Sequence, residues 1–230
     1  MRSTMLAVLL AIGAVPASPC FSQTRAPAQH GERGRYGNPA DLDGYIAHLA
    51  DPARDAWQKP DEVVAALRLR PGQVACDVGA GPGYFTLRLA RAVGAAGRVY
   101  AVDVEPKILD ALRERLAKSG LRNVTPVLAL ADDPLLPAAA CDVVLIVDTY
   151  HHFPERVAYL GGLARALRPG GRIVNIDYHK RETPVGPPLA HRLSRETFLD
   201  EAKSAGLVVA EEPSFLPYQY FIVLRPKPAR

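Results

Sequence analysis

Short apolar runs alternate along the chain with stretches in which apolar residues recur every three or four positions. This alternation predicts an α/β domain, doubly wound, with a mostly parallel seven-stranded sheet. The expected strands are 74–78, 97–103, 124–130, 141–148, 172–177, 207–210 and 215–224. The expected helices are 61–69, a stretch beginning at Phe85, 106–119, 154–167 and 194–205.

The first 59 residues follow another pattern. An uncharged apolar run at 5–15 follows Arg2 and is too short to span a bilayer, which predicts a signal peptide at 1–22. Residues 23–59 are expected to form a flexible leader and a cap helix, since 41–58 has a weak helical pattern. The protein would be periplasmic or secreted if bacterial. It would be cytoplasmic if the segment is not used.

Composition fits one soluble domain after signal removal, without stable membrane insertion. The 230 residues are 48% hydrophobic and 23% charged, with a formal net charge of +4. No Lys/Arg cluster with interleaved aromatic residues occurs, so no nucleic-acid partner is expected. Cys76 and Cys141 are expected at opposite ends of the sheet. We therefore predict no disulfide between them and interpret both as small core residues.

The most informative stretch joins the first strand to the following helix. Asp77 ends the strand, and glycines follow at positions 79, 81 and 83. Such a turn lets the backbone bend sharply and approach a ligand at the carboxyl end of a parallel strand. A dinucleotide fingerprint would require a third glycine where Tyr84 stands, so a nicotinamide oxidoreductase is the weaker alternative.

The run from Asp77 to Gly83 resembles the first motif, D-x-G-x-G-x-G, of class I S-adenosylmethionine (SAM) dependent methyltransferases. Segments 131–137, 148–153 and 167–173 resemble later motifs of that family. The resemblance covers residues 60–226 and implies a Rossmann-like methyltransferase fold. It also implies SAM as cofactor and a small-molecule acceptor, with the quinone-biosynthesis and small-molecule methyltransferases as the nearest type.

The resemblance also implies a cofactor site. Asp77 would lie near the aminocarboxypropyl end of SAM, Asp132 near the adenine, and Asp148 near the methionine part or the acceptor. Asp103, about twenty residues beyond the glycine turn, is placed to accept hydrogen bonds from the ribose hydroxyls. The predicted cofactor set comprises Asp77, Gly79, Ala80, Gly81, Gly83, Tyr84, Asp103, Val104, Asp132, Asp133 and Asp148.

A possible base follows the fourth strand. Tyr150, His151 and His152 come directly after its acidic end, and a histidine there could remove a proton from the acceptor. The alternative is that both histidines only support the start of the next helix. Adjacent histidines point in different directions, and no Cys/His/Glu cluster completes a ligand set, so no metal site is predicted.

The acceptor side is less defined. A helical cap over the cleft is common in the resembled family, so Tyr36, Tyr45, His48 and Trp57 could face the acceptor. The loop after residue 177 is expected to be solvated. A non-catalytic SAM-binding module has the same cofactor positions and stays open as an alternative. SAM is made in the cytosol, so export raises the question of how it reaches the protein.

Overall fold

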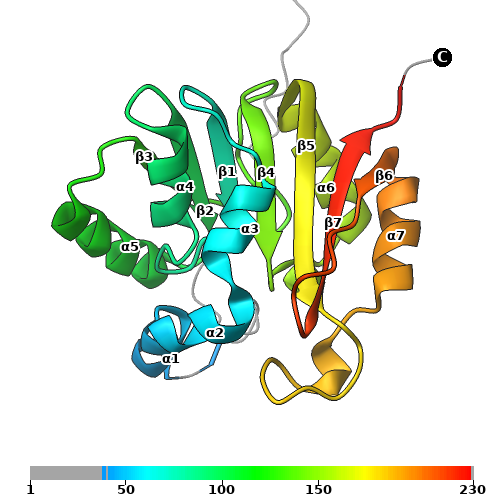
Figure 1. Ribbon diagram of the computed structural model, residues 1–230, viewed down its shortest axis with the longest axis horizontal. Coiled ribbons are helices and arrows are strands. Elements are labelled where there is room, and N and C mark those ends of the chain that lie inside the picture. The colour runs from blue at the N-terminus through cyan, green and yellow to red at the C-terminus, as the bar shows by residue number, and fades with distance from the viewer. Residues whose placement is uncertain (1–37, 40, 229–230) are drawn as a thin grey trace, which may run out of the picture. The chain divides into compact units, whose positions relative to one another are not determined.

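The computed structural model describes residues 38–39 and 41–228, which include a seven-stranded sheet in the order β3-β2-β1-β4-β5-β7-β6 (Figure 1). Neighbouring strands are parallel except that β7 is antiparallel to both β5 and β6. The strands are β1 (Val74–Val78), β2 (Arg98–Asp103), β3 (Val124–Leu128), β4 (Cys141–Val147), β5 (Leu167–Tyr178), β6 (Leu207–Glu211) and β7 (Gln219–Pro226). The predicted fold class is confirmed.

Helices cover both faces of the sheet. Alternate residues of β4 show the division: Val143 and Leu145 belong to the core beneath α3 and α4, and Val144 and Ile146 belong to the core beneath α6 and α7. These helices are α3 (Pro60–Ala66), α4 (Thr86–Val93), α5 (Pro106–Ser119), α6 (Arg156–Ala166) and α7 (Arg195–Ser204). Within the described residues, no helix combines the length and apolarity needed to cross a bilayer.

The N-terminal cap differs from the single helix expected over 41–58. It consists of α1 (Leu42–Leu49), the short 3₁₀ turn η1 (Pro52–Arg54) and α2 (Asp55–Gln58). The break has a local cause, because the Asp51 side chain accepts from the Ala53 amide and Pro52 starts a new turn. The signal peptide predicted at 1–22 lies outside the described residues.

Two strand boundaries also differ from the prediction. β5 begins at Leu167 rather than 172, because Leu167 pairs with Cys141 ahead of an irregularity in the ladder. The glycine-rich segment 169–171 is therefore inside the strand, not before it. β7 begins at Gln219, and residues 215–218 precede its ladder with β5.

The prediction of two unpaired cysteines was wrong. Cys76 of β1 and Cys141 of β4 form a disulfide, with a Cα–Cα separation of 6.3 Å and both residues fully buried. In the β1–β4 ladder Cys76 pairs with Val144, three residues beyond Cys141, or roughly 10 Å in a regular strand. The chain is irregular between Cys141 and Val143, and Cys141 lies closer to Cys76 than regular pairing would place it.

We expect the disulfide to contribute substantially to stability. Opening a cross-link between residues 65 apart in sequence restores conformational freedom to the unfolded chain, which typically lowers the free energy of unfolding by about 2–5 kcal/mol. Urea unfolding of Cys141→Ala should shift to lower urea than the parent, and reductant should shift the parent but not the variant. Cys20→Ala is the matched control. Alkylation of all three cysteines in unreduced, denatured parent would contradict the cross-link.

Candidate functional site

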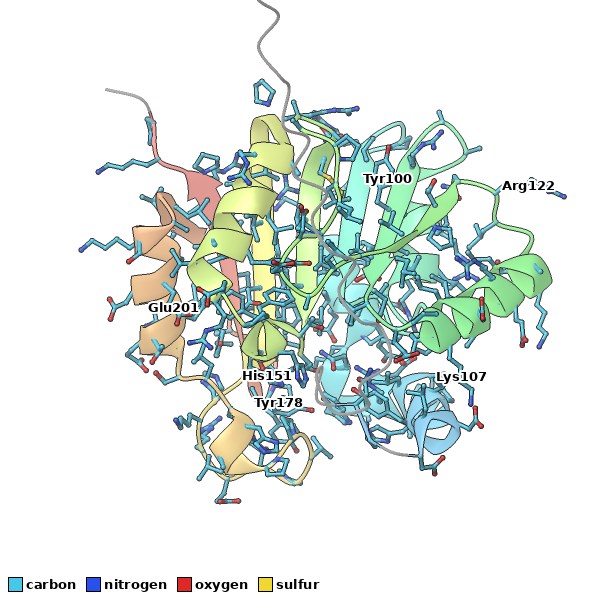
Figure 2. All side chains as sticks on the ribbon, turned by 180° about the vertical axis from the view of Figure 1, so that it is seen from behind. Tyr100, Lys107, Arg122, His151, Tyr178 and Glu201 are labelled. Carbon is cyan, nitrogen blue, oxygen red and sulfur yellow. A yellow bond between two sulfur atoms is a disulfide. The ribbon has the colours of Figure 1, made fainter. Side chains whose placement is uncertain are left out.

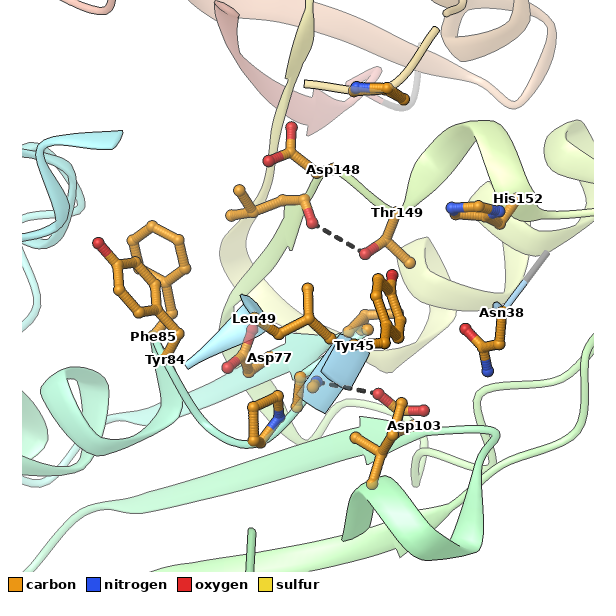
Figure 3. Close-up of a pocket in the computed structure, with 18 of the residues that line it drawn as sticks. Asn38, Tyr45, Leu49, Asp77, Tyr84, Phe85, Asp103, Asp148, Thr149 and His152 are labelled. Carbon is orange, nitrogen blue, oxygen red and sulfur yellow. Dashed lines mark hydrogen bonds between the residues drawn. The ribbon is translucent and has the colours of Figure 1, made fainter. Parts of the chain in front are cut away.

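A cavity of about 730 Å³ lies at the carboxyl edge of β1, β2 and β4, within the range of small-molecule sites (Figure 3). The strand ends and the glycine turn form its floor. The cap lies over it, with Tyr45 and Leu49 of α1, Arg54 of η1 and Trp57 of α2 among its lining. Tyr45, His48 and Trp57 thus line the cavity as the sequence suggested, and Tyr36 lies outside the described residues.

The glycine turn is hydrogen-bonded to β2, and the absence of a side chain at Gly79 lets Thr149 pack closely against it. The amides of Gly79 and Ala80 both donate to the Val102 carbonyl, at 2.9 and 3.0 Å. Gly79 has φ +74°, and a Cβ there would collide with the Thr149 side chain. Gly83 does not line the cavity. It instead allows close packing, since a Cβ would meet the side chains of α4 and α5.

Asp77 is buried at the start of this turn. The Thr86 hydroxyl donates to its Oδ2 at 2.6 Å. Burial raises the pKa of Asp77 to about 7; the Thr86 hydrogen bond opposes the shift and the charge of Asp103 adds to it. A cationic ligand group at this carboxylate would favour the ionised form. The ammonium of an amino acid moiety has the required charge.

Asp103 is the last residue of β2, and each of its carboxylate oxygens accepts one backbone hydrogen bond. Its Oδ2 accepts from the Gly81 amide at 2.9 Å and its Oδ1 from the Glu105 amide at 3.0 Å (Figure 3). Burial raises its pKa against these backbone hydrogen bonds. Each carboxylate oxygen can accept a further bond, so the residue can receive two neighbouring hydroxyls from the cavity side.

His151 pairs with an aspartate that the sequence analysis did not select. Its Nδ1 lies 2.9 Å from Oδ2 of Asp177, which is the penultimate residue of β5 and is fully buried. Burial lowers the pKa of His151, but the hydrogen bond and charge of Asp177 and the charge of Asp148 outweigh it, so the pKa is raised. With Nδ1–H donating to Asp177, the other ring nitrogen, Nε2, keeps its lone pair.

The other two predicted bases are placed differently. Tyr150 does not line the cavity: it is buried, and its hydroxyl donates to Glu201 Oε2 at 2.8 Å. Burial, that hydrogen bond and the Glu201 charge raise its pKa, which removes it as a base. His152 lines the cavity, and its ring centroid lies 4.2 Å from that of His151. Burial and the charge of His151 lower the pKa of His152.

The remaining predicted cofactor residues divide into two groups. Val104, Tyr84 and Asp148 line the cavity, whereas Asp132 and Asp133 are not among its lining residues. Asp133 instead shapes a turn by accepting from the Leu135 amide at 2.9 Å. Asp148 accepts from Gln219 Nε2 at 2.6 Å, and desolvation together with the charge of Asp177 raises its pKa to about 7.

The loop after β5 is exposed or half-buried from 179 to 191, as expected, but it ends at a buried arginine. Arg192 is buried and donates to the carbonyls of Pro187 at 2.8 Å and Arg181 at 2.7 Å, and its guanidinium lies 4.9 Å from the Tyr178 ring centroid. These contacts of Arg192 hold residues 185–187 against the cavity, which Tyr178 also lines (Figure 2). No sequence motif marked Arg192. Its role is visible only in the folded structure, where the buried guanidinium donates to backbone carbonyls.

Two further observations limit the chemistry. Of the described residues that line the cavity, Arg54 is the one Lys or Arg, and its guanidinium lies 4.3 Å from the Tyr84 ring centroid. In the part of the chain that the structure describes, no three His, Cys, Asp or Glu side chains gather as a metal site. The cavity is lined by aliphatic and aromatic side chains and backbone, and its charged groups are mostly the carboxylates of Asp51, Asp77, Asp103 and Asp148.

Known proteins share both the sequence pattern and the fold. A family profile described as "Methyltransferase domain" matches residues 75–171. The ubiquinone/menaquinone biosynthesis C-methyltransferase UbiE of Vibrio vulnificus is 31% identical over 147 residues, 64% of this chain and 55% of that protein. The chain thus spans about half the length of the curated relatives it matches.

Solved structures extend the likeness beyond residues 75–171. A SAM-dependent methyltransferase from Aquifex aeolicus is 28% identical with a TM-score of 0.75, covering 79% of this chain and 96% of that one. A putative type 11 methyltransferase from Sulfolobus solfataricus is 25% identical with a TM-score of 0.56, covering 68% and 85%.

The seven-stranded sheet, its glycine turn and these matches define a class I methyltransferase fold. The chain carries a SAM-dependent methyltransferase domain of that class, matched over residues 75–171, and SAM is the methyl donor of such domains. The cavity fits that donor, because buried carboxylates without a neighbouring lysine lie where an ammonium and ribose hydroxyls would supply partners.

We expect Asp103→Ala to weaken SAM binding by roughly 1–3 kcal/mol, because ligand hydroxyls lose a charged acceptor. Isothermal calorimetry with SAM measures it. The matched control is Asp110→Ala, which removes an exposed carboxylate of α5 that pairs with Arg113. Unchanged SAM affinity in Asp103→Ala would refute the ribose assignment, and so would tighter binding of NAD than of SAM by the parent.

Proposed function

We propose that this protein transfers a methyl group from SAM to a small-molecule acceptor, with His151 as the general base. The observation that carries the proposal is the His151–Asp177 pair, 2.9 Å apart, on a cavity whose floor is the glycine turn. The family relationship supports the donor. The paired histidine supports catalysis over a module that only binds SAM.

The chain's residues divide the work of the reaction. When bound, SAM supplies an electrophilic methyl group on a sulfonium sulfur. Asp77 would bind the ammonium and Asp103 the ribose hydroxyls, which lie on opposite sides of the sulfonium sulfur. Together they would fix where the methyl group is presented. Holding both reactants in line in this way can contribute about 7–11 kcal/mol to lowering the barrier.

His151 handles the proton. As an acceptor oxygen, nitrogen or sulfur forms its bond to the methyl carbon, its proton passes to His151 Nε2, and the carbon–sulfur bond breaks to leave S-adenosylhomocysteine. Asp177, hydrogen-bonded to Nδ1, keeps the ring oriented and stabilises the resulting imidazolium. A carbon acceptor activated by an adjacent hydroxyl would use the same base.

The acceptor side favours a flat, partly apolar molecule. Trp57 and Tyr178, with ring centroids 5.7 Å apart, line it together with Pro187. Relatives named for ubiquinone and menaquinone biosynthesis support beginning an acceptor screen with hydroquinones and phenols, followed by amines and thiols. SAM binding with no turnover on any of these would favour the binding-module alternative.

We expect His151→Ala to lose about 10²–10⁴-fold in kcat, since a general base typically contributes that much. SAM affinity should stay nearly unchanged. Parent kcat should fall as pH drops through the His151 pKa, which lies above its usual value, because the protonated ring cannot accept a proton. SAM affinity should also fall below pH about 7 as Asp77 is protonated.

Two variants complete this test. Asp177→Asn should lower kcat by less than His151→Ala and shift the pH profile toward acid, because the carboxylate that raises the His151 pKa is gone. Tyr150→Phe, which removes a hydroxyl bound to Glu201 outside the cavity, should lose thermal stability but keep most turnover per folded molecule. Near-parent kcat in His151→Ala would leave positioning as the mechanism.

We also propose that the protein is exported. Two features support it: the apolar run at 5–15 and the disulfide between Cys76 and Cys141, a bond that persists mainly in oxidising compartments. N-terminal sequencing of protein made in its native host should give a terminus shortly after residue 17 or 22. An intact Met1 or Arg2 terminus would overturn the proposal.

A further inference from the structure

Two buried glutamines connect the cap to the floor of the cavity. Gln58 Nε2, from the last residue of α2, donates to Gln219 Oε1 at 2.9 Å. Gln219 Nε2, from the first residue of β7, donates in turn to Asp148 Oδ1 at 2.6 Å. The two amides are 0% and 2% exposed, so neither has water as an alternative partner.

The chain of hydrogen bonds has a single direction. Arg54 Nη2 lies 3.3 Å from Gln58 Oε1 and can only donate, and at the other end Asp148 accepts through Oδ1 at 2.6 Å. If either amide turned over, two donors or two acceptors would face each other inside the protein. The ends therefore fix the orientation of both amides.

The other contacts of the cap are not fully buried: Asp55 accepts from the Tyr84 hydroxyl, Arg54 lies over the Tyr84 ring, and Trp57 lies against Tyr178. Neither α1 nor η1 has a buried residue, and Gln58 is the one buried residue of α2. The ion pair of Asp43 with Lys107 is well exposed, and that of Asp55 with Arg88 is partly so. Exposed pairs of this kind contribute only about 0–1 kcal/mol.

We propose that Gln58 and Gln219 act as a directional latch, which holds the cap closed over the cavity and keeps Asp148 aimed at the bound ligand. The inference rests on the proposed function for the identity of that ligand. Both glutamines are positioning residues, since they act through Asp148 and through the cap. Asp148 has φ +51°, a backbone conformation that a non-glycine residue keeps only when its surroundings hold it.

A built-in probe reports on the cap. Trp57 is the one tryptophan in the sequence, and it lies on α2 one residue before Gln58, lining the cavity. All tryptophan fluorescence, and its quenching by acrylamide, therefore comes from one position on the cap. The experiment compares full-length parent, Gln58→Leu, Gln219→Met and Gln58→Glu, with SAM affinity measured by calorimetry on the same samples.

We expect both apolar variants to raise the acrylamide quenching constant of Trp57. SAM affinity should fall about 2–12-fold, the loss of one hydrogen bond. The matched control, Asn123→Ala, removes an amide that bridges the Ala90 and Gly94 carbonyls away from the cavity. It should lower the melting temperature while leaving quenching and SAM affinity at parent values.

Gln58→Glu tests the direction. An ionised carboxylate beside Arg54 would present an acceptor to Gln219 Oε1, so Gln219 would turn over and lose its bond to Asp148. Quenching of Trp57 in Gln58→Glu should therefore rise above that of the parent.

The possible failures are distinguishable. A parent that binds no SAM defeats the proposed function. A parent that binds SAM, with latch variants equal to it in quenching and affinity, overturns the latch. Increased quenching in the Asn123→Ala control equal to that of the latch variants would also overturn it, because the cap would then respond to stability alone.

Discussion

Negative charge buried at one edge of the sheet is the constraint on which this site depends. Asp77, Asp103 and Asp177 are buried there, and Asp148 faces the same cavity. Burying carboxylates is unfavourable unless donors surround them. The donors are a hydroxyl from α4, backbone amides from the glycine turn, an imidazole, and a glutamine from β7. Much of the local architecture exists to provide them.

The fold could be predicted because its signals are local. Apolar runs and helical periodicity mark the strands and helices, and alternation of the two marks a parallel sheet. The glycine turn could be predicted for the same reason, since Gly79 has a positive φ that other residues rarely adopt. The strand-end acids followed from topology, because carboxyl ends of parallel strands share an edge.

What the sequence did not reveal depends on side-chain direction. Asp148 adopts a left-handed backbone conformation without being glycine, and the turn after it sends the Tyr150 side chain toward Glu201 while His151 meets Asp177. The disulfide depends on an irregular stretch of β4 next to Cys141. Neither feature has a local sequence signal. The assumption of regular strands and turns therefore placed Tyr150 in the cavity and kept Cys76 and Cys141 apart.

The disulfide also divides the site into parts with different freedom to change. It ties β1, which contains Asp77, to β4, which precedes Asp148, so the two strands that form the donor floor cannot slide past each other. The cap and the loop held by Arg192 have no covalent cross-link to this floor, and the cap meets it through the hydrogen bonds from Gln58 to Gln219 and from Gln219 to Asp148. New acceptor preferences would therefore arise through changes in these covering segments that keep those hydrogen bonds, on one fixed donor platform.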